Sequence, residues 1–226
     1  MARKTEDPKG FGRRYSPDER DCNHLIPRRA VQQLPARKTW IAGGVLDQGQ
    51  TPQCVGYAGW GWLSSSPIRN KPKFTPTDLY HEAQADDEWP GNDYDGSSTR
   101  GLFKALTRMG FVSGYQWAFD VEPLIGHVLT VGPVCVGTDW YAGMSQPDAK
   151  GFLNTTGAKQ GGHEWLILGA DREKHATDGT IGAFRMLNSW GLPWGQGGRA
   201  WVSFATVDRL IKQKGEACTA KEVLVK

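Results

Sequence analysis

Four side chains have the types and the order that nucleophilic catalysis requires. Cys54 offers a thiol, His163 an imidazole that can carry a proton, and Asn188 an amide that can orient the imidazole. Gln48 precedes Cys54 by six residues across a turn-rich loop, so its side-chain amide could fold back beside the sulfur. With the backbone N–H of Cys54, it would bind a developing oxyanion. The set predicts acyl transfer through a covalent thioester.

The nucleophile candidate is expected at the start of a helix over residues 54–63. Val55, Ala58 and Trp62 recur there at the spacing of one helix face. The unpaired N–H groups and the positive end of the helix dipole would favour the thiolate form of Cys54 over the thiol.

The imidazole and the amide are expected at the ends of two neighbouring strands. His163 opens an apolar run that predicts a strand over residues 164–168, and Asn188 follows a predicted strand over residues 184–187. If these strands are adjacent, Asn188 can accept the ring N–H of His163. Trp190 would then cover that hydrogen bond and keep water from competing for it.

The composition of the chain and its predicted helices and strands indicate an N-terminal arm followed by two lobes. Residues 1–39 are charged and rich in Pro and Arg, so we expect an extended arm without regular structure that wraps over the globular body. Residues 40–226 are expected to form one α+β domain, with a helical lobe over about 40–130, a β lobe over about 131–226, and a cleft between them. Further helices are predicted at 76–85, 98–109, 123–130 and 207–214, and further strands at 133–136 and 199–204.

Composition and charge exclude several classes of protein. The 226 residues are 38% hydrophobic, enough for one buried core, and 27 basic residues against 24 acidic ones are too balanced for a nucleic-acid or membrane-surface protein. No stretch reaches the roughly 18 apolar residues of a membrane span. Residues 1–23 lack the apolar core of a signal peptide, so we expect a cytoplasmic protein.

Other reactive residue types have simpler structural interpretations. A lone cysteine on a helix is most often a small buried hydrophobe, and Cys54 differs only through its accompanying residues. No zinc site, disulfide framework or cofactor motif is indicated, and the acidic residues at 86–88 predict a solvated turn better than a metal site. The residues expected to be structural are Cys22, Cys135, Cys218, His24, His81, His127 and His175.

Three segments together resemble the papain-like (cathepsin-like) family of cysteine peptidases. LDQGQTPQCVGYA, residues 46–58, is similar to the family's nucleophile segment, and GGHEWLILGA, residues 161–170, to its histidine strand. NSWGLPWGQGG, residues 188–198, resembles its asparagine segment closely, including both tryptophans. Residues 95–110 are similar to the wall of the substrate groove, and GPV at 132–134 resembles a strand that lines a substrate pocket.

The resemblance implies a two-lobed fold, in which the helical lobe carries the nucleophile helix and an antiparallel sheet or barrel carries His163 and Asn188. It implies an endopeptidase with a polypeptide substrate and without a metal or cofactor, and it leaves the oligomeric state open. It also assigns substrate contacts to Gly96, Ser97, Val134, Gly162 and Trp194.

The sequence departs from the family pattern beside the nucleophile. The usual disulfide cysteine is Thr51, the usual aromatic residue after the nucleophile is Val55, and Pro52 and Gln53 replace small residues, so we expect a reshaped groove. The lack of disulfides and the charged arm resemble the bacterial and bacteriophage branch of the family. A phage-encoded protein would act in the host cytoplasm or the virion.

Two other functions remain open on the sequence alone. A cell-wall peptide amidase or transpeptidase would use the same four residues as a peptidase. A catalytically silent binding or virion-structural module would keep the fold without the reaction, although the intact reacting residues favour an enzyme. The arm itself could cover the groove.

Overall fold

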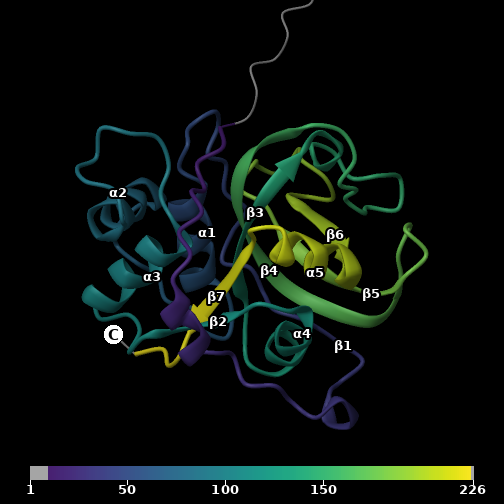
Figure 1. The fold of residues 1–226 in the computed structure, drawn as a ribbon. Helices are drawn as coiled ribbons and strands as arrows, with labels where there is room; N and C mark the ends of the chain where they lie inside the picture. Colours follow the sequence, from purple (N-terminus) through teal and green to yellow (C-terminus); the bar gives the residue numbers. More distant parts are fainter. Residues whose placement is uncertain (1–9, 225–226) are drawn as a thin grey trace, which may run out of the picture.

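The computed structural model describes residues 10–224. The first nine residues of the predicted arm, with Arg3, Lys4 and Lys9, lie outside the described residues, as do residues 225–226. Figure 1 shows a group of helices on one side of the molecule and a twisted sheet on the other, with the N-terminal chain running between them.

Three helices form the first half of the molecule, close to their predicted positions. They are α1 (Cys54–Ser64), α2 (Pro76–Asp86) and α3 (Thr99–Arg108). α2 begins with a capping box, in which the Thr75 hydroxyl accepts the Asp78 N–H and the Asp78 carboxylate accepts the Thr75 N–H. α1 and α2 lie close together because Gly56 has no side chain; a Cβ there would lie 2.4 Å from the carbonyl oxygen of Pro76.

An antiparallel sheet forms the second half, in the strand order β2-β7-β3-β4-β5-β6. All four predicted strands are confirmed, whereas β2 and β7 are not among the predictions. β7 is buried at all five positions, so it lacks the polar and apolar alternation that indicates a strand. The bounds are β2 (Tyr115–Ala118), β3 (Val134–Tyr141), β4 (Lys159–His175), β5 (Ile181–Leu187), β6 (Arg199–Ser203) and β7 (Glu216–Ala220).

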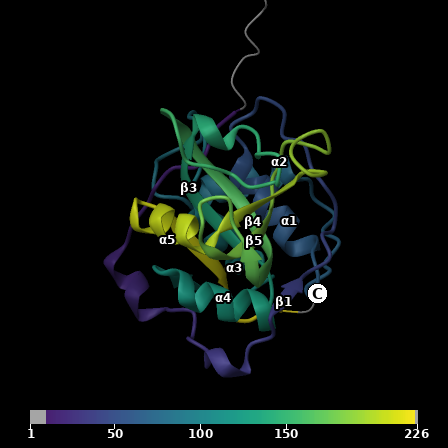
Figure 2. The ribbon, with the colours of Figure 1, turned by 90° about the vertical axis from the view of Figure 1, so that its right-hand side faces the viewer.

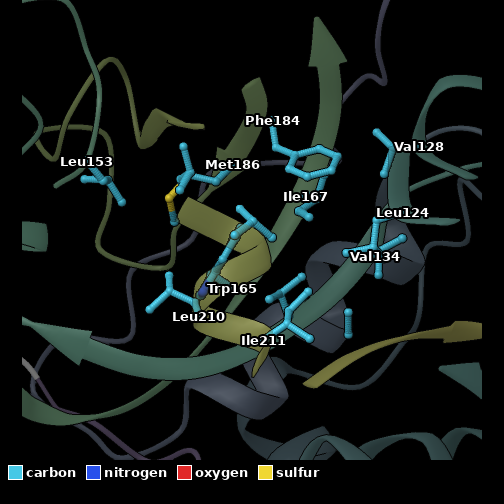
Figure 3. Packing of buried hydrophobic residues seen from close by; sticks show 14 of the residues in the cluster. Leu124, Val128, Val134, Leu153, Trp165, Ile167, Phe184, Met186, Leu210 and Ile211 are labelled. Atoms are coloured by element: carbon cyan, nitrogen blue, oxygen red, sulfur yellow. The ribbon is translucent and has the colours of Figure 1, made fainter. Parts of the chain in front are cut away.

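Strand β4 separates two hydrophobic cores. Trp165 and Ile167 belong to the core that includes α4 (Val121–Thr130) and α5 (Phe204–Lys212), part of which is shown in Figure 3. Leu166 and Leu168 belong to the core formed with α1, α2 and α3. Successive residues of a strand point to opposite faces, which explains why this run is apolar without interruption.

Helix α4 lies within the residue range expected for the helical lobe, but it packs in the core of the sheet. Its residues Leu124, Val128 and Leu129 share that core with Val134 of β3. Figure 2 shows α4 beneath the sheet and apart from α1. The boundary expected near residue 130 therefore does not separate the two cores.

The arm has regular structure, contrary to the prediction. Among its described residues are two short 3-10 helices, η1 (Glu19–Asn23) and η2 (Val31–Gln33), and a strand, β1 (Arg37–Thr39). β1 pairs with residues 169–171 of β4. The side chains of Asp21 and Arg100 form a buried ion pair, so η1 is fixed by a contact with α3 that local sequence patterns do not reveal.

Candidate active site

Cys54 lies at the first position of α1 and is completely buried. Burial raises the pKa of its thiol to about 12, and hydrogen bonds from the backbone N–H groups of Glu164 and Gly12 act weakly in the opposite direction. The thiol is therefore neutral in this conformation. This differs from the thiolate expected from the helix start, because desolvation outweighs the helix dipole.

His163 and Asn188 form the hydrogen bond predicted from their positions at two strand ends. His163 Nε2 lies 2.8 Å from Asn188 Oδ1, and both side chains are buried. The same Oδ1 accepts the backbone N–H of Ser189 at 2.8 Å, which fixes the orientation of the amide. Burial lowers the pKa of His163 to about 4, so the imidazole is neutral. Its Nδ1 has no hydrogen-bond partner within residues 10–224.

Aromatic rings surround the imidazole of His163. The ring centroid of Trp190 lies 5.0 Å away, in the covering position that the sequence suggests. Trp140 lies at 4.8 Å and in turn packs 5.1 Å from Trp190. Trp140 is not among the predicted site residues, because nothing in its local sequence on β3 distinguishes it from a core tryptophan.

Gln48 joins the nucleophile loop to the asparagine segment. Its backbone N–H donates to the Ser189 carbonyl at 2.8 Å, and its Oε1 accepts the Ser189 hydroxyl at 2.5 Å. Its Nε2 donates to the carbonyl oxygens of Thr51 at 2.7 Å and Gly10 at 3.1 Å. The amide that the sequence assigns to an oxyanion thus holds a backbone carbonyl from the N-terminal arm.

Residues 10–14, which we call the strap, cross the site and bind both halves of the molecule. The N–H of Arg13 donates to the Gly162 carbonyl at 3.0 Å, on β4 beside His163. On the other side, the N–H of Ser97 donates to the Gly12 carbonyl and the N–H of Arg14 to the Ser97 carbonyl, both at 2.8 Å. In Figure 1 the strap is the purple chain between the helices and the sheet.

The strap fits against the loop of Cys54 without space for further side chains. A Cβ on Gly12 would lie 1.8 Å from the Pro52 carbonyl oxygen, and one on Gly10 would lie 2.2 Å from that of Thr51. Gly96 has a φ of +89°, and a Cβ there would lie 2.2 Å from the Gly12 carbonyl oxygen. Glycine is therefore needed on both sides of this contact.

The structure brings three of the five predicted substrate-contact residues to the strap. Gly96, Ser97 and Gly162 contact it through their backbones. Trp194 packs behind Trp190, with ring centroids 5.8 Å apart. Val134 is buried in the core of the sheet.

The position of β3 that reaches the strap is Gly137, three residues after Val134. A Cβ on Gly137 would lie 2.7 Å from Arg13 Nε. The sequence match at 132–134 includes the first residue of this strand, and the contact with the strap lies further along it.

The remaining reactive residues have structural roles or partners. The four cysteines are free thiols, with Cys22 exposed and the others buried. The acidic turn at 86–88 forms ion pairs with Arg108 and Lys104. Within the described part of the chain, no group of three or more His, Cys, Asp or Glu side chains is arranged to hold a metal ion. No helix in residues 10–224 has the length and apolar character needed to cross a membrane.

Comparison with known proteins gives matches among solved structures only. No protein-family model matches the sequence, and no curated protein sequence matches it. The structure is similar to that of xylellain, a cysteine protease from Xylella fastidiosa, with a TM-score of 0.70 and 18% identity over 96% of this chain and 98% of that one.

Two further similarities span most of this chain. Procathepsin L 3 from the larval midgut of Tenebrio molitor matches with a TM-score of 0.64 and 18% identity, over 94% of this chain and 75% of that one. Bromelain from Ananas comosus, in complex with the inhibitor E64, matches with a TM-score of 0.60 and 13% identity, over 83% and 99%. At these identities the comparisons establish the fold alone, and the chain has the two-lobed α+β fold of papain-like cysteine proteases.

Proposed function

We propose that this protein is a cysteine endopeptidase whose nucleophile is Cys54. The observation that carries the proposal is the buried hydrogen bond of 2.8 Å between His163 and Asn188. The backbone N–H of the next residue, Glu164, is close enough to Cys54 to act on the pKa of its thiol. The fold shared with papain-like proteases supports it.

The proposed reaction gives each of the four residues a defined role. The Cys54 thiolate attacks the carbonyl carbon of a peptide bond, and Gln48 Nε2 and the Cys54 N–H bind the oxyanion. His163, which has taken the thiol proton, gives it to the leaving amine as the C–N bond breaks. Water, deprotonated by His163, then hydrolyses the thioester and releases the acid. Asn188 orients the imidazole throughout.

The conformation described here is a closed one. The strap fills the place beside Cys54 and His163 that a substrate would need, and Gly10 engages the oxyanion donor of Gln48. Displacing the strap would hydrate the site, lowering the pKa of Cys54 and raising that of His163 toward the thiolate and imidazolium forms. A peptide substrate must therefore compete with the strap.

Alkylation by an irreversible thiol-directed inhibitor such as E64 tests the proposal. The full chain carrying Phe11→Ala and Gly12→Ala, which weakens the strap, is expected to be labelled at Cys54 much faster than at the exposed Cys22 of the same molecule. His163→Ala in this background should remove the excess rate. Equal labelling of the two thiols, in a chain whose strap is shown by hydrogen exchange to have opened, would contradict the proposal.

The variant with the weakened strap also distinguishes an endopeptidase from the two other functions that the sequence leaves open. Hydrolysis of casein indicates an endopeptidase, whereas release of peptides from peptidoglycan without casein hydrolysis indicates a cell-wall amidase. A labelled Cys54 with neither activity would point to a binding module that retains a reactive thiol.

A further inference from the structure

The side chain of Arg13 leaves the strap and enters a pocket between the two halves of the molecule. It is only 1% exposed. Its Nε and Nη2 both donate to Glu216 Oε2, at 3.1 and 2.7 Å, and Nη2 also donates to the backbone carbonyl of Lys214 at 2.8 Å. The pocket thus already binds a guanidinium group through two different acceptors.

A second acidic side chain faces the same place. Glu164 is completely buried, and its Oε2 accepts the hydroxyl of Thr99 at 2.8 Å. Its Oε1 has no hydrogen-bond partner among the described residues. The hydroxyl oxygen of Thr99 also lies 3.3 Å from Glu216 Oε2, so this hydroxyl links the side chains of Glu164 and Glu216.

The sheet forms the floor of this pocket by placing three residues in one row. Gly137 of β3 is paired with Glu164 of β4 on one side and with Glu216 of β7 on the other. A Cβ on Gly137 would lie 2.5 Å from Glu164 Oε2 and 2.7 Å from Arg13 Nε. A side chain at this position would therefore fill the space that the guanidinium occupies.

The guanidinium in this pocket belongs to Arg13 of the strap, whereas Glu164 and Glu216 belong to the sheet. When the strap leaves, Glu216 loses both of its contacts with the guanidinium, and the Lys214 carbonyl loses its donor. The Glu216 carboxylate, left without its charged partner, favours a cation that restores the pairing. The strap places this pocket near the reacting bond, because Arg13 directly follows Gly12, which packs against the loop of Cys54.

We propose that this pocket, which we call the Glu164–Glu216 pocket, binds an arginine side chain of the substrate near the scissile bond and makes the enzyme selective for basic sequences. This inference rests on the proposed function. Arginine is favoured over lysine, because a planar guanidinium reaches the Glu216 carboxylate and the Lys214 carbonyl together.

A binding experiment tests the pocket without requiring catalysis. Full-length Arg13→Ala protein is titrated with N-acetyl-arginine methylamide or its uncharged isostere, N-acetyl-citrulline methylamide, and the melting temperature is followed. The arginine compound is expected to raise the melting temperature saturably and the citrulline compound to have no effect. Adding Glu216→Gln, or Glu164→Gln if that variant does not fold, should abolish the shift. Equal shifts with both compounds, or none with either, would overturn the inference.

A turnover experiment tests the role in substrate selection. Peptides in which arginine or citrulline occupies one position at a time are supplied to the full chain carrying Phe11→Ala and Arg13→Ala. The best arginine position should raise kcat/KM roughly tenfold or more over citrulline, as expected for hydrogen bonds to a charged group. Equal kcat/KM values would reject the pocket as a specificity site. Failure to hydrolyse any peptide, with Cys54 unlabelled, would instead reject the proposed function.

Discussion

The phenyl ring of Phe11 stands edge-on to the imidazole of His163, with ring centroids 6.0 Å apart and an interplanar angle of 89°. The same phenyl ring lies 6.0 Å from Trp190. Phe11 therefore extends the aromatic enclosure of the imidazole onto the strap. This relationship links the position of the N-terminal arm to the ionisation of His163, because the buried imidazole is held neutral.

Replacing Phe11 by alanine should open the strap more often. A half-buried phenylalanine contributes on the order of 1–2 kcal/mol, so Phe11→Ala is expected to speed the alkylation of Cys54 by iodoacetamide about tenfold. Mass spectrometry of the Cys54 peptide, with the exposed Cys22 as internal reference, measures the rate. Leu25→Ala is the matched control, because Leu25 lies in the same arm with its side chain 52% exposed. Equal rates in both variants would show that Phe11 does not hold the strap.

Adding one methyl group to Gly12 should displace the strap from the sulfur. A Cβ at this position would lie 1.8 Å from the carbonyl oxygen of Pro52, and overpacking of this kind costs about 1–3 kcal/mol. Gly12→Ala should therefore accelerate alkylation of Cys54 at least about fivefold while the fold is kept. Gly44→Ala, where a Cβ would meet nothing within 4 Å, serves as control and should leave the rate unchanged.

The parts of the site that the sequence predicts are those encoded locally. Cys54 at a helix start, and His163 and Asn188 at the ends of two apolar runs, follow from patterns of a few residues each. Their meeting requires only that the two strands be neighbours, and β4 and β5 are paired at Leu166 and Leu187. Helix caps such as Thr75 are equally local, so helix positions are predicted to within a few residues.

The strap and the Glu164–Glu216 pocket depend on contacts that leave no local pattern. The strap is bound mainly through backbone groups of Gly12, Ser97 and Gly162, and hydrogen bonds of this type carry no side-chain signature. Arg13 and Glu216 are 203 residues apart, and each is charged in a sequence context typical of an exposed residue. Burial of these charges becomes visible only when the arm is placed between the two halves.

The buried ion pair between Asp21 and Arg100 should be a major attachment of the arm. Asp21→Asn removes the hydrogen-bonded carboxylate of Arg100, a residue that is only 5% exposed, and leaves it a longer ion pair of 3.6 Å with Glu88. Breaking a buried pair of this kind costs about 3–5 kcal/mol. Arg28→Ala removes the exposed pairs with Asp120 and Glu122 and should cost less than about 1 kcal/mol.

The free energy of unfolding in urea compares these two variants. Similar values for Asp21→Asn and Arg28→Ala would contradict a structural role of the buried pair. The comparison also explains why deleting the whole arm is an ambiguous test of its inhibitory role. Such a deletion would remove this ion pair and strand β1 together with the strap.

Between pH 6.5 and 8, raising the pH should destabilise the protein through Glu164. Burial raises the pKa of this carboxyl to about 8, so the folded chain keeps a proton that the unfolded chain has released. The free energy of unfolding should fall by up to about 1.4 kcal/mol per pH unit, and the raised pKa of Glu216 acts in the same direction. His163, with its pKa lowered to about 4, gives the opposite slope, but only below pH 6.5.

Urea denaturation at intervals across pH 6.5–8 tests this assignment. Glu164→Gln should flatten the dependence, because an amide does not titrate, and Glu173→Gln at an exposed carboxylate should retain it. The thiol of Cys54, with its pKa raised to about 12, contributes only above the window. A slope that persists unchanged in Glu164→Gln would mean that Glu164 is already charged in the folded protein, and the two carboxylates of the pocket would then share the single guanidinium of Arg13.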